Sequence, residues 1–221
     1  MEAVIKGMRW SWTPAIVATG LVAAGTVGTV AAAGTSARLR TAGTVVAHVE
    51  NLARLPMSDV EGAERIVGRT LQDAAVAIEW AHDAEPPAEM PRIGDMHIRV
   101  RLLGGAPPGW IERRGDRDDV LGFATADAGS HALVAYVLAD RVAAKASVGR
   151  YPVAWLLGDV MAHEVGHLLL PSGYGHSNKG VMRPQVQARI GAAPRFTDEE
   201  AALIRQRARQ HFTETDTWRL Q

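Results

Sequence analysis

The sequence predicts an α+β domain in which a sheet of several strands packs against helices. Two patterns predict it: some segments alternate apolar and polar side chains, as strands do, and others repeat apolar side chains at helical spacing. A third observation is the long segment Val153–Leu169, which is apolar on most sides and therefore predicts a buried helix. The predicted order is strand, helix, strands, buried helix and final helix.

Composition limits the class of protein. The chain has 221 residues, enough for one domain with a sizeable core once a leader is set aside. Its 24 basic and 24 acidic side chains balance, which indicates no nucleic-acid groove and no polybasic membrane patch, so the expected partner is a polypeptide. Cysteine is absent, which leaves histidine and carboxylates as metal ligands and excludes a disulfide scaffold.

Residues 1–33 have the pattern of a signal peptide or an N-terminal anchor. Lys6 and Arg9 precede the apolar run Ala15–Ala33, which ends in three alanines typical of a cleavage site. The run is rich in Ala, Gly and Thr and would be a weak spanning helix, so a cleaved export signal is favoured over an uncleaved anchor. Either predicts an extracytoplasmic location, with a cytoplasmic one as the third alternative. Residues 34–43 follow as a linker.

The first part of the predicted domain contains a strand, a long helix and a loop. Thr44–Val49 is rich in β-branched residues and predicts the first strand. A helix is expected over Asp59–Glu79, with Asp59 as its N-cap. The apolar run Val76–Trp80 fits a second strand equally well, because it matches both periods. Three prolines in Glu85–Pro91 indicate a loop.

More strands are expected in the middle of the chain. Met96–Leu102 alternates cleanly and predicts a strand with one face on a core. His97 lies on the polar face, so we expect it to be solvated rather than a ligand. Gly104–Asp119 indicates an irregular surface segment, His131–Leu138 another strand, and Asp140–Ala146 a short helix or turn.

The buried helix is predicted to begin at Pro152 and to end near Leu169. Proline suits the first turn of a helix, where its missing N–H costs nothing. Pro171 cannot continue a helix and disfavours a helical Leu170. Polar side chains inside such a helix need partners, and a metal ion is one.

The chemistry of the chain centres on this helix. His163 and His167 are four residues apart, so both imidazoles leave the same helical face and can bind one ion. Glu164 is then placed to act on a metal-activated water. A catalytic zinc needs three protein ligands and an open position, and His176 is the nearby downstream residue that completes the set. The alternatives are an accidental HExxH on a surface helix and a solvated His176.

These residues resemble the metzincins, zinc peptidases with the pattern HExxHxxGxxH and a methionine-bearing turn beneath the metal. His163, Glu164 and His167 match this pattern, His176 stands for the third ligand, and Met182 stands for the methionine of the Met-turn.

The sequence departs from the metzincin pattern between the second and third ligands. Leu170 occupies the place of the family glycine, Gly173 occupies that of the third histidine, and His176 comes three residues later. Gly173 and Gly175 can supply the permissive backbone that the longer loop needs.

The resemblance implies a single zincin-like catalytic domain over residues 44–221, with a twisted mixed sheet over two long helices. It implies a cleft between the sheet edge and the active-site helix, and a zinc-dependent endopeptidase activity with Glu164 as general base. It also implies that an edge strand pairs with an extended substrate. The residues of that segment are Leu121, Gly122, Phe123 and Ala124. An ordinary strand without a ligand remains the alternative.

Two side chains are candidates for supporting roles. Asp159 lies one turn before His163 and either holds its imidazole in the metal-binding tautomer or reaches solvent. Tyr174, in the loop before His176, is a candidate for stabilising an oxyanion or lining a pocket.

The final helix is expected to start with a capping box, Thr197 to Glu200, and to run to about Gln210. Glu199 or Glu200 could be a third metal ligand from a downstream helix. Both fit better as first-turn acids, which the helix dipole favours.

Two other functions remain open from the sequence. One is a zinc hydrolase of a non-peptide amide, with the same centre and a different cleft. The other is a non-catalytic zinc-binding domain, against which Glu164 argues because a structural ion has no use for an acid there.

Overall fold

The computed structural model describes residues 43–82, 96–107, 120–126, 133–185 and 193–217. The predicted leader, residues 1–33, lies outside the described residues, and so does the linker apart from residue 43. The predicted loop Glu85–Pro91 and most of the irregular segment, residues 108–119, also lie outside them.

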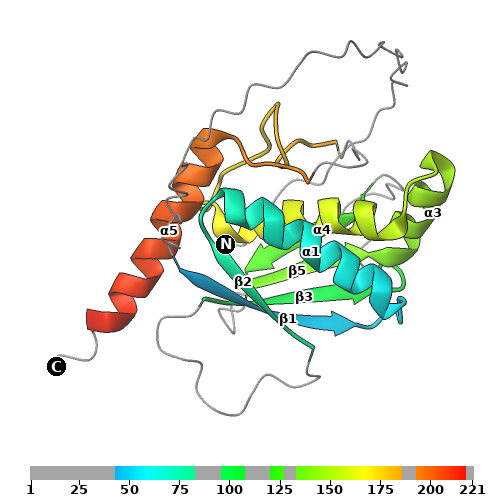
Figure 1. Ribbon diagram of the computed structural model, residues 1–221, viewed down its shortest axis with the longest axis horizontal. Helices are drawn as coiled ribbons and strands as arrows, with labels where there is room; N and C mark the ends of the chain where they lie inside the picture. Colours follow the sequence, from blue (N-terminus) through cyan, green and yellow to red (C-terminus); the bar gives the residue numbers. More distant parts are fainter. Residues whose placement is uncertain (1–42, 83–95, 108–119, 127–132, 186–192, 218–221) are drawn as a thin grey trace, which may run out of the picture.

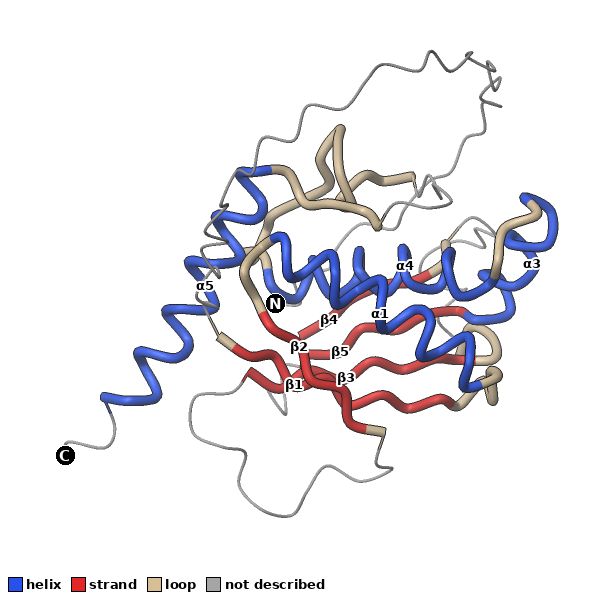
Figure 2. Tube along the Cα trace, viewed as in Figure 1, coloured by secondary structure: helices blue, strands red, loops and turns tan. Residues whose placement is uncertain are grey.

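Five strands form one mixed sheet, which confirms the predicted α+β class. The strands are β1 (Thr44–Asn51), β2 (Ala77–Ala81), β3 (Met96–Leu103), β4 (Gly122–Ala126) and β5 (Leu133–Leu138). Their order is β2-β1-β3-β5-β4. All neighbours are parallel except β4 and β5, which are antiparallel. Figure 2 shows the strands as one layer beneath α1 and α4. Strand β4 is therefore an antiparallel edge strand of an otherwise parallel sheet.

The described helices are α1 (Met57–Asp73), α3 (Ala139–Gly149), α4 (Val153–Leu169) and α5 (Asp198–Thr217). Helices α1 and α4 pack side by side across one face of the sheet (Figure 1). Helix α5 passes the C-terminal end of α4, and α3 lies near the N-terminal end of α4 (Figure 1). Helix α4 thus lies between α1, the sheet and α5, which explains why its sequence is apolar on most sides.

The core lies between the sheet and the two packed helices. Strand β3 illustrates how the sequence builds it, because its side chains alternate between buried and half-buried positions as predicted. Its buried side chains are Met96, Ile98, Val100 and Leu102.

The predicted helix over Asp59–Glu79 was too long. Helix α1 ends at Asp73, and the chain reverses at Ala75, which has a φ of 56°, before β2 begins. The alternative of a second strand at this place is therefore confirmed. Asp59 is not the N-cap: Pro56 occupies that position, and Asp59 lies in the first turn.

Three other predictions needed adjustment. The segment predicted as a short helix or turn is the helix α3, and α5 continues beyond Gln210 to Thr217. His97 is not solvated: it is half-buried, and its Nδ1 lies 3.0 Å from Nε2 of His48. The sequence could not indicate this contact, because the two histidines lie on different strands.

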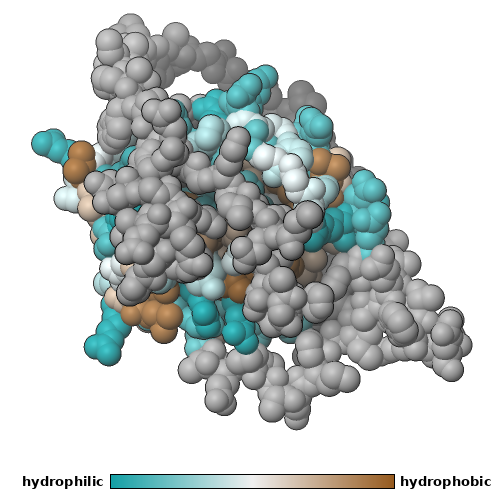
Figure 3. Space-filling model, turned by 180° about the vertical axis from the view of Figure 1, so that it is seen from behind, coloured by the Kyte–Doolittle hydropathy of each residue, from teal (hydrophilic) through white to brown (hydrophobic). Residues whose placement is uncertain are grey.

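The described surface has few large hydrophobic side chains. Those that are exposed are Leu52, Met57 and Val148. Seen from behind, the hydrophobic colour appears only in small separate areas between hydrophilic ones and the undescribed residues (Figure 3). Within the described ranges, no helix combines the length and the hydropathy needed to span a membrane.

Candidate metal centre

Three imidazoles converge above the C-terminal half of α4. Nε2 of His167 lies 3.1 Å from Nε2 of His163 and 3.3 Å from Nε2 of His176. All three ligand atoms lie within 4.8 Å of one another, and no other group of three potential ligands of this kind is found in the described part of the chain. Three nitrogens that bind one zinc tetrahedrally, at 2.0–2.1 Å, lie about 3.3 Å apart. The spacing therefore fits a single metal ion of this size.

His163 is oriented by the backbone of the turn that contains Met182. Its Nδ1 lies 2.7 Å from the carbonyl oxygen of Val181, and only an N–H at that position can make this hydrogen bond. In the neutral ring, Nε2 then carries the lone pair and faces the other two imidazoles. A hydrogen bond of this kind at the distal nitrogen is typical of metal-ligating histidines.

Burial keeps the three rings in the neutral form that binds metals. It lowers the pKa of His163 to about 4, although the hydrogen bond to Val181 acts in the opposite direction. It lowers the pKa of His167 to about 3, with a smaller contribution from the two neighbouring imidazoles. The pKa of His176 is also lowered by burial. At neutral pH no proton has to leave these rings before a cation binds.

The helix and the following loop place these ligands as the sequence predicted. Helix α4 begins after Pro152 as its N-cap and ends at Leu169, because Leu170 is extended and Pro171 follows. Gly173 has a φ of 86°, the left-handed conformation that glycine allows without strain. The loop then returns far enough for the ring of His176 to reach that of His167.

Met182 packs directly against helix α4, next to the histidines. Its side chain is fully buried, and a Cβ atom added to Gly166 would lie only 2.5 Å from its sulfur atom. Gly166 therefore lets the methionine approach the backbone of α4 between the two helical ligands. The sequence pattern indicated Met182 but not Gly166 or Val181. A glycine inside a buried helix was the available signal for a close approach.

Glu164 lies on the side of α4 that faces the sheet edge. Its side chain is buried, and a Cβ atom at Gly122 of β4 would lie 2.8 Å from its Oε1. Glycine at this position thus lets the carboxylate lie against the edge strand. The segment singled out in the sequence, Leu121 to Ala124, coincides with the start of β4, and all four of its residues are buried.

The structure shows the surroundings of the two supporting candidates, Asp159 and Tyr174. Asp159 is not the partner of His163, because the Val181 carbonyl takes that nitrogen. Asp159 does not reach solvent either: it is 6% exposed, and burial raises its pKa to about 7. The hydroxyl of Tyr174 lies 3.5 Å from Oε1 of Glu200, so it is directed toward α5 rather than toward the imidazoles.

The acids at the start of α5 have the role that the capping pattern predicted. Glu200 is fully buried, and its Oε2 accepts a hydrogen bond of 2.8 Å from the backbone N–H of Thr197. The Thr197 hydroxyl lies 3.2 Å from the N–H of Glu200, which completes the capping box. Glu199 is exposed, and neither acid belongs to the group of three histidines that could bind a metal ion.

No protein-family model and no curated protein matches this sequence. The family resemblance therefore depends on the motif residues alone. The chain has an α+β fold with a five-stranded mixed sheet, and it brings three histidines close enough to bind a metal ion.

Proposed function

We propose that this protein is a zinc-dependent endopeptidase with a metzincin-like catalytic domain. The observation that carries the proposal is the convergence of three neutral imidazoles with the buried Glu164 directly beside one of them. The antiparallel edge strand next to Glu164 and the buried methionine under the ligands support the same assignment.

The donor set favours zinc. Three imidazole nitrogens with no thiolate, since the chain has no cysteine, suit a zinc ion that keeps one position open. His163, His167 and His176 would hold it. When bound, zinc would polarise the scissile carbonyl and lower the pKa of water to about 7.

Glu164 is the proposed general base. It would accept a proton from the attacking water and pass it to the leaving amine, a role that needs a carboxylate beside the ligands and shielded from bulk solvent. The helix fixes this position, because Glu164 follows His163 directly. A metal that only stabilised the fold would not require an acid there.

The substrate class follows from the strand beside Glu164. Strand β4 has β5 on one side and no described strand on the other. An extended polypeptide could add to this edge through backbone hydrogen bonds, which bind many sequences. The scissile peptide bond would then lie between β4 and the metal ligands.

Hydrolysis of a mixed peptide library, with and without a chelator, tests the proposal. We expect chelator-sensitive cleavage that zinc restores, and a loss of about 10²–10⁴-fold in Glu164→Gln with metal binding retained. Glu199→Gln is the matched control, since Glu199 is exposed on α5 and touches no ligand atom in the group.

Each other outcome has a defined meaning. Cleavage that a chelator does not inhibit would overturn the metallopeptidase assignment. Bound metal without turnover of any peptide or other amide would favour the non-catalytic zinc-binding domain. Turnover restricted to non-peptide amides would favour the other hydrolase class.

We also propose an extracytoplasmic location. The support is the pattern of residues 1–33, in which Lys6 and Arg9 precede an apolar run that ends in alanines. N-terminal sequencing of protein from the culture medium and the membrane fraction would separate a cleaved signal from an anchor. Recovery of the full chain from the cytoplasm alone would contradict both.

A further inference from the structure

One face of α5 points toward the loop that carries His176. Glu200, Ile204 and Arg207 follow each other at helical spacing and therefore lie along one stripe. Glu200 and Ile204 are buried, and the two polar members contact the loop at different points. Helix α5 thus presents two polar groups to the loop, with a buried isoleucine between them.

Arg207 holds the point where the loop begins. Its Nη1 donates a hydrogen bond of 2.6 Å to the carbonyl oxygen of Leu170, the residue after the last turn of α4. The carbonyl groups at the end of a helix lack intrahelical partners. A charged donor from another helix satisfies one of them and ties the loop to α5.

Glu200 holds the loop nearer to the ligand. Its Oε2 accepts the N–H of Thr197 in the capping box, and its Oε1 lies 3.5 Å from the hydroxyl of Tyr174. Tyr174 precedes His176 by two residues. A single buried carboxylate therefore contacts both the start of α5 and the ligand loop.

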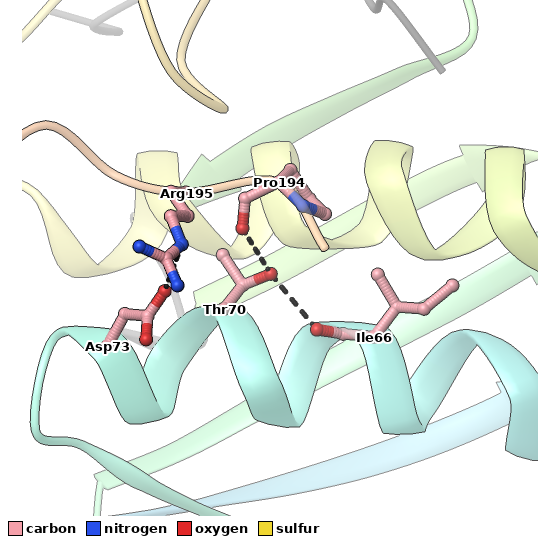
Figure 4. A network of polar contacts seen from close by, with 5 residues as sticks. All are labelled: Ile66, Thr70, Asp73, Pro194 and Arg195. Carbon is pink, nitrogen blue, oxygen red and sulfur yellow. Dashed lines mark hydrogen bonds and ion pairs between the residues drawn. The ribbon is translucent and has the colours of Figure 1, made fainter. Parts of the chain in front are cut away.

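The segment before α5 is itself fixed to the rest of the fold. The Thr70 hydroxyl on α1 lies 2.9 Å from the carbonyl oxygen of Pro194, and Arg195 pairs with Asp73 at 3.1 Å (Figure 4). The carbonyl oxygen of Arg195 also accepts a hydrogen bond of 2.8 Å from the N–H of Val181. The base from which α5 reaches the loop is thus anchored on both α1 and the Met-turn.

We infer that Glu200 and Arg207 are positioning residues that hold the loop of residues 170–176 against α5 and thereby place His176 beside the two helical ligands. This inference rests on the proposed metal centre but not on peptide hydrolysis. His163 and His167 are placed by the helix they belong to. His176 comes from a segment outside the helices and strands, so contacts from elsewhere must fix it.

Metal affinity of the full chain tests this inference. We expect Glu200→Gln and Arg207→Ala each to weaken zinc binding about 10–100-fold in competition with a chromogenic chelator, the range typical of groups that orient ligands. Glu199→Gln and Arg205→Ala are matched controls on the same helix, and we expect them to bind zinc as the unmodified chain does. Cobalt-loaded protein should show a changed visible spectrum only in the first pair.

A double-substitution experiment separates positioning from general destabilisation. In a His176→Ala background, Glu200→Gln should cause little further loss of affinity, because the ligand it positions is already absent. The same loss in both backgrounds would overturn the inference. If Glu200→Gln fails to fold, Tyr174→Phe replaces it, because this substitution removes only the hydroxyl that contacts Glu200. Tyr174→Phe must then weaken zinc binding in the unmodified chain and have little further effect in the His176→Ala background.

The outcomes distinguish this inference from the proposed function. An unmodified chain that binds zinc without cleaving peptides would overturn the peptidase and leave the positioning role in place. Normal zinc affinity in Glu200→Gln and Arg207→Ala, with peptide cleavage intact, would overturn the positioning role alone. Recovery of affinity in Arg207→Lys, relative to Arg207→Ala, would support the donor role of this side chain.

Discussion

Helix α4 and the loop after it contribute histidines to the same candidate metal centre by different means. His163 and His167 lie on a buried helix whose hydrogen bonds fix their spacing, whereas His176 reaches the centre through contacts that its segment makes with α5 and with the turn that contains Met182. The helical ligands are therefore determined locally, and the loop ligand by tertiary structure. The difference predicts that substitutions in the two regions will have different consequences.

The largest effect is expected from replacing a helical ligand. Loss of one ligand from a zinc site costs roughly 3 kcal/mol, or about 100-fold, if the 10–16 kcal/mol of a four-ligand site is shared equally. His163→Ala also leaves the buried Val181 carbonyl without its partner, which lowers the folding stability of the protein by about 1–3 kcal/mol. His176→Ala should cost less, because the released loop regains conformational entropy.

Isothermal titration with zinc measures the difference in affinity, and thermal unfolding of the metal-free variants measures the cost of the lost Val181 hydrogen bond. If His176→Ala bound zinc more weakly than His163→Ala, this result would contradict the comparison between helix and loop.

The second effect concerns Asp159, a buried acid on α4. Burial alone raises the pKa of the Asp159 carboxyl from 3.8 to about 7. The folded state then holds more protons than the unfolded state between these values, so the contribution of Asp159 to stability decreases as pH rises from 4 to 7. The full penalty above pH 7 is at most about 4 kcal/mol.

Asp159→Asn should therefore be more stable than the unmodified chain at pH 8, and the gain should disappear near pH 4. Denaturant unfolding at several pH values measures it, with Asp198→Asn on the exposed start of α5 as control. A gain independent of pH would show that the charge of Asp159 is not its cause.

A third effect contrasts a glycine in the helix with one in the loop. Gly166→Ala places a Cβ atom 2.5 Å from the sulfur of Met182, whereas a Cβ atom at Gly175 meets nothing within 4 Å. Overpacking costs about 1–3 kcal/mol and outweighs the gain of about 1 kcal/mol in helix propensity.

Thermal unfolding of Gly166→Ala should show this loss of stability. A zinc titration of the same variant should show weaker binding. Gly175→Ala should stay within about 0.5 kcal/mol of the unmodified chain. Equal behaviour of the two variants would mean that Met182 can move away from α4 freely.

The smallest effect lies within the loop itself. Gly173→Ala forces a side chain into the left-handed region at a φ of 86°, with a cost of about 1–2 kcal/mol. No atom lies within 4 Å of the added Cβ, so backbone strain alone is responsible. We expect zinc affinity to fall while the unfolding temperature of the metal-free protein changes little, because Gly173 is exposed and its added Cβ atom meets no core side chain.

The sequence predicted what depends on local chemistry. The ends of α4, the capping box from Thr197 to Glu200 and the alternation of β3 each follow from residue types at short spacing. The boundary between α1 and β2 was ambiguous, because the apolar run there fits both periods and only packing against β1 selects the strand.

What the sequence did not reveal depends on residues that meet across the fold. The carbonyl of Val181, the hydrogen bond from Arg207 and the contact of His48 with His97 join segments that are far apart in the chain. Asp159 was for this reason one candidate for fixing the tautomer of His163, since the sequence shows a carboxylate one turn away but does not show which backbone oxygen lies near the ring.

The oxygen that orients His163 belongs to the main chain, and every amino acid carries it. Exchange of the side chain at position 181 therefore leaves the acceptor in place, provided that the backbone keeps its path. The choice of the nitrogen that faces the ion depends on the length and course of this turn. A single-residue insertion or deletion between His176 and Met182 should for that reason be more damaging to the centre than any side-chain exchange at position 181.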